Sequence, residues 1–167
     1  MPDLPTRQSA LAQTPKLDEL IQERRDLWIQ RLYAPDGAPR LPLPVDPNRA
    51  GYRDGLHALW LAPGEWLLVS EGAMAPADIG DGALSDLSHA RTVFRIPVAA
   101  AREILARGCP LDLRPEVFSP GHCAQSVMAS VAILVHFLED GAHMDIYVAR
   151  SYGQFMHAWL KDAALSL

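Results

Sequence analysis

The sequence has no run of apolar residues long enough to cross a membrane. A membrane-spanning helix needs about 20 consecutive apolar residues. The longest candidate, Val127 to Leu138, is interrupted by Ser130 and His136 and has the length of a strand. The N-terminus carries early charges and prolines in place of the apolar stretch of a signal peptide. We therefore expect neither a membrane association nor export.

Cysteines and basic residues are also scarce. The chain of 167 residues has two cysteines, Cys109 and Cys123, and 15 Lys and Arg against 20 Asp and Glu, for a net charge of −5. Without an export signal, we expect two reduced thiols and a cytoplasmic location. Nucleic-acid binding needs a clustered excess of basic residues. The composition therefore predicts no nucleic-acid partner.

The motifs of cofactor binding are missing as well. The sequence contains neither G-x-G-x-x-G nor G-x-x-x-x-G-K-[ST], so we expect no nucleotide or flavin on this chain. Residues of metal-ligating type occur without a recognisable ligand spacing, and we predict no metal site. These residues are His122, Cys123, His136, His143 and Asp145. His136 lies in an apolar strand and is expected to be a hydrogen-bonded core histidine.

One short segment combines the residue types of an acid, a nucleophile and a base. Asp86, Ser88 and His89 lie within four residues. In a strand, however, Ser88 and His89 point to opposite faces and cannot form a dyad. Cys109 follows a helix end, where the helix dipole disfavours a thiolate. The sequence thus predicts no catalytic residue.

The remaining pattern predicts an α+β domain with a mainly antiparallel sheet and helices packed on one face. Asp140-Gly141 is expected to form a tight turn, and Gly108 a left-handed helix end. Ser151 and Gln154 predict a capping box before an amphipathic helix. The expected strands are 57–61, 66–70, 87–96, 123–128, 131–139 and 143–148, with a helix over 99–107.

The N-terminal part predicts a separate extension, 1–50, before a single domain over 51–167. Apolar residues at approximate helical spacing predict a helix over about 15–32, and the prolines of 34–48 predict an extended connector. The stripe of Leu20, Leu27 and Trp28 on this helix either packs on its own domain or meets another chain. We identify it as the candidate partner interface, which could also support self-association of the isolated chain.

Five segments together resemble a known family. They are LWLAPGEWLLV (59–69), DLSHARTVFRI (86–96), AREILARGCPLDL (101–113), FSPGHCAQS (118–126) and DIYVARSYGQFMHAWL (145–160). The set is similar to the gamma subunits of heterotetrameric sarcosine oxidases, which are related to the folate-binding domain of the glycine-cleavage T-protein.

The resemblance implies a non-catalytic subunit that supports assembly of a flavin-dependent complex. Such complexes demethylate sarcosine to glycine, releasing hydrogen peroxide and passing the one-carbon unit to tetrahydrofolate. The partners implied are alpha, beta and delta subunits, and FAD, FMN, NAD, tetrahydrofolate and zinc are implied for those subunits and not for this chain.

Two departures from enzymes of this fold support a non-catalytic role. SVAILVHFL (130–138) lacks the carboxylate that T-protein-like enzymes carry in the corresponding strand, and FSPGHCAQS lacks the K-G-C-Y-x-G-Q-E pattern of related proteins. We therefore expect no activity from the isolated chain. The alternative is a free-standing folate-binding or one-carbon-transfer protein of the same fold.

Overall fold

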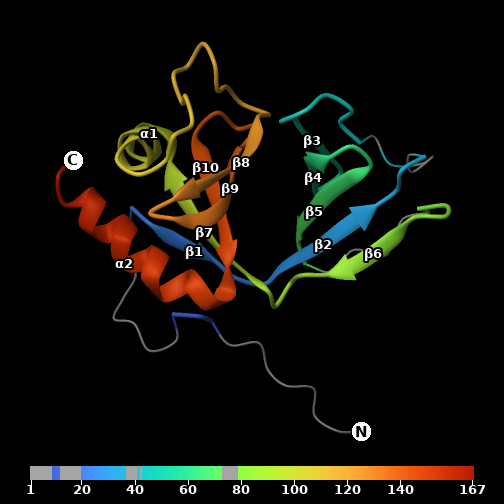
Figure 1. Ribbon diagram of the computed structural model, residues 1–167, viewed down its shortest axis with the longest axis horizontal. Helices are drawn as coiled ribbons and strands as arrows, with labels where there is room; N and C mark the ends of the chain where they lie inside the picture. Colours follow the sequence, from blue (N-terminus) through green and yellow to red (C-terminus); the bar gives the residue numbers. More distant parts are fainter. Residues whose placement is uncertain (1–8, 12–19, 37–40, 42, 73–78) are drawn as a thin grey trace, which may run out of the picture.

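Two antiparallel sheets stand side by side, and two helices cover the outer face of one of them (Figure 1). The computed structural model describes residues 9–11, 20–36, 41, 43–72 and 79–167. Its elements are β1 (Gln22–Arg24), β2 (Leu27–Tyr33), β3 (Ala50–Arg53), β4 (Leu56–Ala62), β5 (Glu65–Glu71), β6 (Ala83–Asp86), β7 (Arg91–Pro97), α1 (Val98–Ala106), β8 (Cys123–Met128), β9 (Val131–Phe137), β10 (His143–Ala149), a 3-10 turn (Arg150–Tyr152) and α2 (Gly153–Ala164).

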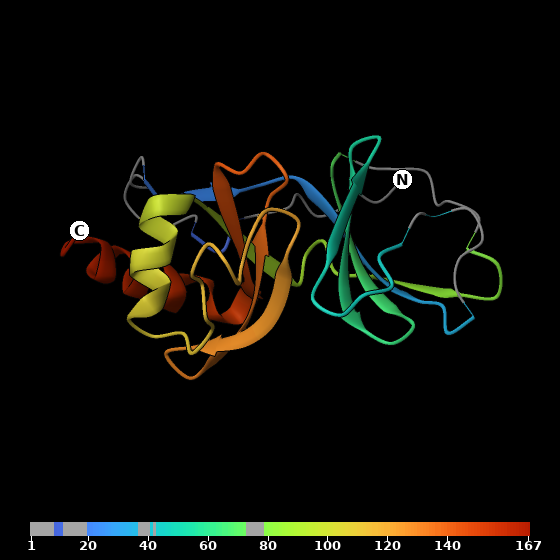
Figure 2. The ribbon, with the colours of Figure 1, turned by 90° about the horizontal axis from the view of Figure 1, so that it is seen from above.

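The first sheet has the order β1-β7-β10-β9-β8, and the second has the order β3-β4-β5-β2-β6. Figure 2 shows the helices and the second sheet on opposite sides of the first sheet. The predicted fold class is therefore confirmed, with the strands divided between two sheets. No helix among the described residues is long and apolar enough to cross a bilayer.

Local signals placed most elements after residue 55 correctly. The β4–β5 hairpin turns at Pro63-Gly64, and Gly64 has the positive φ of 73° that glycine adopts readily. The Asp140-Gly141 turn is confirmed, with Gly141 at φ 68° and the Asp140 carboxylate accepting from the amides of Ala142 and His143. The strand expected over 87–96 begins only at Arg91, because Leu87–Ala90 form a turn.

The predicted N-terminal helix is wrong over residues 20–32, and residues 15–19 lie outside the described part. β1 pairs with β7, and β2 lies between β5 and β6 in the second sheet. Leu27 and Ile29 face the first sheet while Leu32 faces the opposite side, which is strand alternation with apolar residues on both faces. A strand buried on both faces can mimic helical spacing. Residues 20–33 therefore belong to the folded body.

Described residues of the proline-rich segment lie on the outer face of the second sheet. Leu41 and Leu43 pack beside a buried cluster that contains Leu32 and Trp66, and the Trp66 indole Nε1 donates to the Pro44 carbonyl at 2.8 Å. Leu41, Leu43 and Pro44 are therefore part of the domain and not of a tether.

The chain crosses between the sheets twice, and the two crossings run antiparallel beside each other (Figure 1). The first passes from β1 to β2 through Asp26, which has a left-handed φ of 58°. The second passes from β6 to β7 through a turn whose residue Ser88 bonds to Ile29: Oγ accepts from the Ile29 amide at 2.9 Å and donates to its carbonyl at 3.3 Å. These side-chain bonds fasten the two crossings together.

Both predicted helix-end motifs differ from the structure. Gly108 is absent from the residues with positive φ, and a Cβ built on it would lie 2.6 Å from Trp159 Cζ2. Close packing of α2 on the end of α1, not backbone conformation, explains this glycine. At α2, Tyr152 is the N-cap without a side-chain hydrogen bond, because the 3-10 turn moves the helix start past Ser151. The capping-box prediction is therefore wrong.

Candidate functional site between the two sheets

One face of the first sheet meets the second sheet. Strand alternation points every second residue of β7, β8, β9 and β10 toward that face. Its apolar part packs against Leu27, Ile29, Leu59, Leu67 and Val69 of the second sheet. The members contributed by the first sheet are Val93, Cys123, Leu134 and Tyr147. The layer thus has an apolar centre, and polar groups lie next to it.

The first polar group is a buried ion pair on the same face. Arg95 of β7 donates through Nε and Nη2 to the two carboxylate oxygens of Asp145 on β10, both at 2.8 Å. The Asp145 side chain is 4% exposed and that of Arg95 is 18% exposed. The hydrogen bonds from Arg95 to Asp145 raise the pKa of Arg95 despite its burial. The pair satisfies both charges within the layer.

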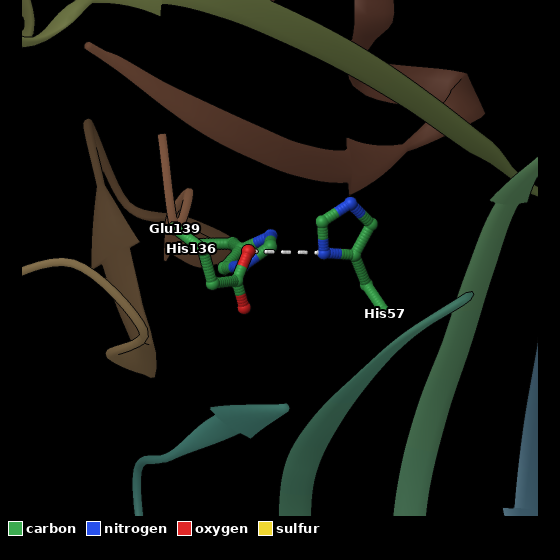
Figure 3. Close-up of side chains that lie close together, drawn as sticks. All are labelled: His57, His136 and Glu139. Carbon is green, nitrogen blue, oxygen red and sulfur yellow. Dashed lines mark ion pairs between the residues drawn. The ribbon is translucent and has the colours of Figure 1, made fainter. Parts of the chain in front are cut away.

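The second polar group joins the two sheets (Figure 3). His57 projects from β4 in the second sheet, while His136 at the end of β9 and Glu139 in the β9–β10 turn belong to the first. Glu139 Oε2 lies 3.2 Å from His57 Nδ1 and 3.8 Å from His136 Nε2. Burial raises the pKa of Glu139, but the contacts with His136 and His57 lower it by a larger amount. The carboxylate is therefore ionised.

A cavity of about 450 Å³ opens elsewhere between the sheets. Arg31, which pairs with Glu65 at 2.5 Å, and Arg91 both line it, together with Gln125 and Tyr147. Burial and the nearby Arg31 lower the pKa of Arg91. Glu65 also lines the cavity and balances Arg31, whereas no carboxylate among the described residues pairs with the Arg91 guanidinium.

The residues considered as metal ligands from sequence separate into different environments. His122 Nδ1 accepts from the Ser119 amide at 3.1 Å, and His143 pairs with Asp140 at 2.9 Å. Cys123 and Asp145 are the register neighbours of His136 on adjacent strands. Asp145 binds Arg95, and the Cys123 thiol donates to the Arg49 carbonyl. Burial raises the pKa of Cys123 to about 12, so this thiol is not a nucleophile at neutral pH.

The expectation that His136 is a hydrogen-bonded core histidine is half correct. It is fully buried, but neither ring nitrogen has a hydrogen-bond partner among the described residues. Ser88 has a structural role at the crossing, and His89 is exposed in the turn beside it. The strand argument against a dyad does not apply, because both residues lie in a turn, and the Ser88 hydroxyl bonds to the backbone of Ile29 instead.

The three residues of the predicted partner interface do not form a common stripe. Leu27 is buried between the sheets, Trp28 packs at the outer face of the second sheet, and Leu20 packs beneath the helices of the first. The helix on which the prediction depended is absent, so these positions provide no joint surface. Partner contacts by any of them stay a prediction.

Sequence reasoning missed His57 and Glu139. His57 follows a turn in the second sheet, far from His136 in the sequence, and no spacing rule connects them. The only local signal is that His136 and Glu139 are three residues apart. The pairing of the two sheets brings the three groups together, and that pairing was not predicted.

Residues 41–166 match the model of the family described as "Sarcosine oxidase, gamma subunit family". The chain belongs to that family. This match covers most of the described chain, including the covering segment after residue 41, both crossing elements β6 and β7, and the inter-sheet layer.

Curated members of the gamma-subunit family are similar over shorter stretches. "Sarcosine oxidase subunit gamma" of Corynebacterium sp. (strain U-96) is 34% identical over 121 residues, covering 68% of this chain and 58% of that protein. The Arthrobacter sp. protein of the same name is 31% identical over 93 residues, covering 52% of this chain and 46% of that protein. The aligned part of the chain thus spans about half the length of these relatives.

A solved structure shares the fold. A chain of the heterotetrameric sarcosine oxidase from Corynebacterium sp. U-96, solved in complex with pyrrole 2-carboxylate, superposes with a TM-score of 0.79 at 23% identity. The match covers 96% of this chain and 95% of that one. The two-sheet arrangement with its N-terminal strands is therefore a fold found in an assembled sarcosine oxidase.

Proposed function

We propose that this chain is a non-catalytic gamma subunit of a heterotetrameric sarcosine oxidase. The observation that carries the proposal is family membership over residues 41–166, supported by the shared fold of a chain in a solved heterotetramer. The complex would demethylate sarcosine to glycine, with hydrogen peroxide and a one-carbon unit for tetrahydrofolate as the other products.

In this proposal, the alpha, beta and delta subunits are the partners. They hold FAD, FMN, NAD, tetrahydrofolate and the zinc of the complex, and this chain holds none of the redox cofactors. The chain contributes a folded surface that the other subunits need for assembly. A cytoplasmic location is part of the proposal and rests on the sequence arguments given above.

Co-expression tests this function directly. A tagged chain is co-expressed with the neighbouring candidate subunits, and the recovered complex is assayed for sarcosine-dependent hydrogen peroxide release. We expect a stoichiometric four-chain complex, and expect its yield to fall sharply when this chain is omitted. Full assembly and activity without this chain would overturn the proposal.

One observation favours a second candidate, a folate-binding protein. Arg91 lines the cavity between the sheets without a carboxylate partner among the described residues, and a guanidinium suits a carboxylate of a folate. Tetrahydrofolate would then raise the melting temperature of the isolated chain in proportion to ligand concentration. A melting temperature that does not change with tetrahydrofolate concentration would contradict the folate-binding candidate, and only the subunit role would remain.

A further inference from the structure

We propose that His57, His136 and Glu139 form a binding site for a divalent transition-metal ion of the zinc type, which clamps the two sheets together. The inference does not depend on the proposed function. It reverses the expectation from sequence that the chain has no metal site, because that expectation considered only ligand spacing within the chain.

The geometry suits one small cation. The ligand atoms of the three residues all lie within 4.8 Å of one another, and two of the separations are 3.2 and 3.8 Å. A tetrahedral zinc ion with bonds of about 2.0–2.1 Å holds its ligand atoms roughly 3.4 Å apart. Figure 3 shows the carboxylate and both imidazole rings converging from opposite sheets. Small side-chain adjustments would complete such a shell.

The unsatisfied nitrogens are an independent indication of a ligand. His136 Nδ1 and Nε2 are buried without a hydrogen-bond partner among the described residues, whereas His57 Nδ1 has its one contact with Glu139. A buried polar atom that leaves water without a new partner bears its full desolvation cost. A proton shared between His57 and Glu139 would stabilise only that contact, whereas a cation can accept lone pairs from all three residues at once.

The ligand set indicates the class of metal. Two neutral imidazoles and one carboxylate suit Zn²⁺ and its neighbours, while Mg²⁺ and Ca²⁺ prefer oxygen ligands throughout. Three protein ligands leave one position for water. Glu139 and His57 are 31% and 21% exposed at their side chains, which provides a route for the ion from solvent.

The surroundings set the expected affinity. Histidine ligands usually donate their second nitrogen to a carboxylate, carbonyl or water, and loss of such a partner weakens metal binding by about 10–100-fold. His136 Nδ1 has no protein partner among the described residues. We therefore expect a dissociation constant in the micromolar range, weaker than that of closed structural zinc sites.

A bound ion would stabilise the arrangement of the two sheets. The chain joins the sheets covalently only at the paired crossings before β2 and after β6. An ion held by β4 on one side and by the end of β9 on the other adds a connection to the hydrogen bonds that already join residues 48–50 to residues 121–123. Because the ion binds the folded chain and not the separated sheets, it raises the melting temperature with increasing metal concentration.

The test uses the tag-free full chain, stripped with a chelator and titrated with Zn²⁺ by calorimetry, with Co²⁺ absorption as a second readout. We expect one Zn²⁺ ion to bind per chain and to raise the melting temperature, and we expect Mg²⁺ to leave the melting temperature unchanged. His57→Gln and Glu139→Gln should each weaken binding by more than the roughly tenfold change that can follow loss of a ligand's hydrogen-bond partner, because each removes a ligand itself. His136→Gln is not the primary variant, because its burial could compromise folding.

The matched control is His143→Gln, which removes an imidazole that pairs with Asp140 outside the cluster. This variant should bind Zn²⁺ like the unaltered chain. Absence of saturable binding to the folded chain would overturn the proposal. So would binding that survives both His57→Gln and Glu139→Gln, or binding that His143→Gln weakens equally.

Discussion

At the scale of single residues, the layer between the sheets contains the Arg95–Asp145 ion pair, and removal of one partner should lower the free energy of unfolding. Asp145→Asn removes the charge that balances Arg95 while the guanidinium stays mostly buried. Breaking a buried pair by removing one partner costs several kcal/mol, and we expect a loss of about 3 kcal/mol in the free energy of unfolding, measured by chemical denaturation. The Asp112–Arg114 pair offers the control, because its carboxylate has the same two-pronged contact in an exposed loop.

Asp112→Asn should leave the unfolding midpoint nearly unchanged, since water replaces an exposed ion pair with little loss. Equal effects of the two substitutions would contradict the view that burial decides how much each ion pair contributes to the free energy of unfolding.

A second residue-scale prediction concerns Gly108, where packing and not conformation excludes a side chain. A Cβ at this position would lie 2.6 Å from Trp159 Cζ2, so Gly108→Ala forces the indole away from the end of α1. Overpacking of this kind costs about 1–3 kcal/mol. Trp159→Phe in the same chain should relieve part of that cost, and a double-mutant cycle by thermal unfolding measures the coupling. If the two effects are simply additive, the contact does not restrict Gly108.

At the scale of elements, the paired crossings are joined by the Ser88 hydroxyl and by a backbone bond from the Leu87 amide to the Ile29 carbonyl at 2.8 Å. Ser88→Ala leaves the buried amide of Ile29 without the acceptor that lies 2.9 Å away. An unsatisfied buried donor costs about 1–3 kcal/mol, and we expect a loss of that size in the unfolding free energy. Ser151→Ala is the matched control, because Ser151 is exposed and caps no helix, and its effect should stay within about 0.5 kcal/mol. Equal losses from both changes would show that the crossing does not depend on this hydroxyl.

The elements also show how far the sequence alone leads. The turns at Gly64 and Gly141, the helix α1 and the apolar face of α2 could be predicted, because each depends on residues close together in the chain. Residues 20–32 could not, because β2 has apolar side chains on both faces and its two coverings come from distant segments. The cluster around Glu139 could not be predicted for the same reason, because its partner His57 lies in the other sheet and far away in the sequence.

At the scale of the whole molecule, the N-terminal strands decide whether the two-sheet body exists at all. Deletion of residues 1–33 removes β1 from the edge of the first sheet and β2 from between β5 and β6 in the second. It also removes the buried side chains of Ile21, Leu27, Ile29 and Leu32, each worth about 1.5–3 kcal/mol. Their sum approaches the whole stability of a domain, about 5–15 kcal/mol. We therefore expect the deleted chain to lose its cooperative thermal transition in circular dichroism, and to fail to join the proposed complex for that reason. A docking segment that lies apart from the body would give the opposite pattern, a chain that melts as before while its assembly with partner subunits is weakened. That pattern would contradict the two-sheet arrangement, since the second sheet cannot keep β5 and β6 in place without the strand between them.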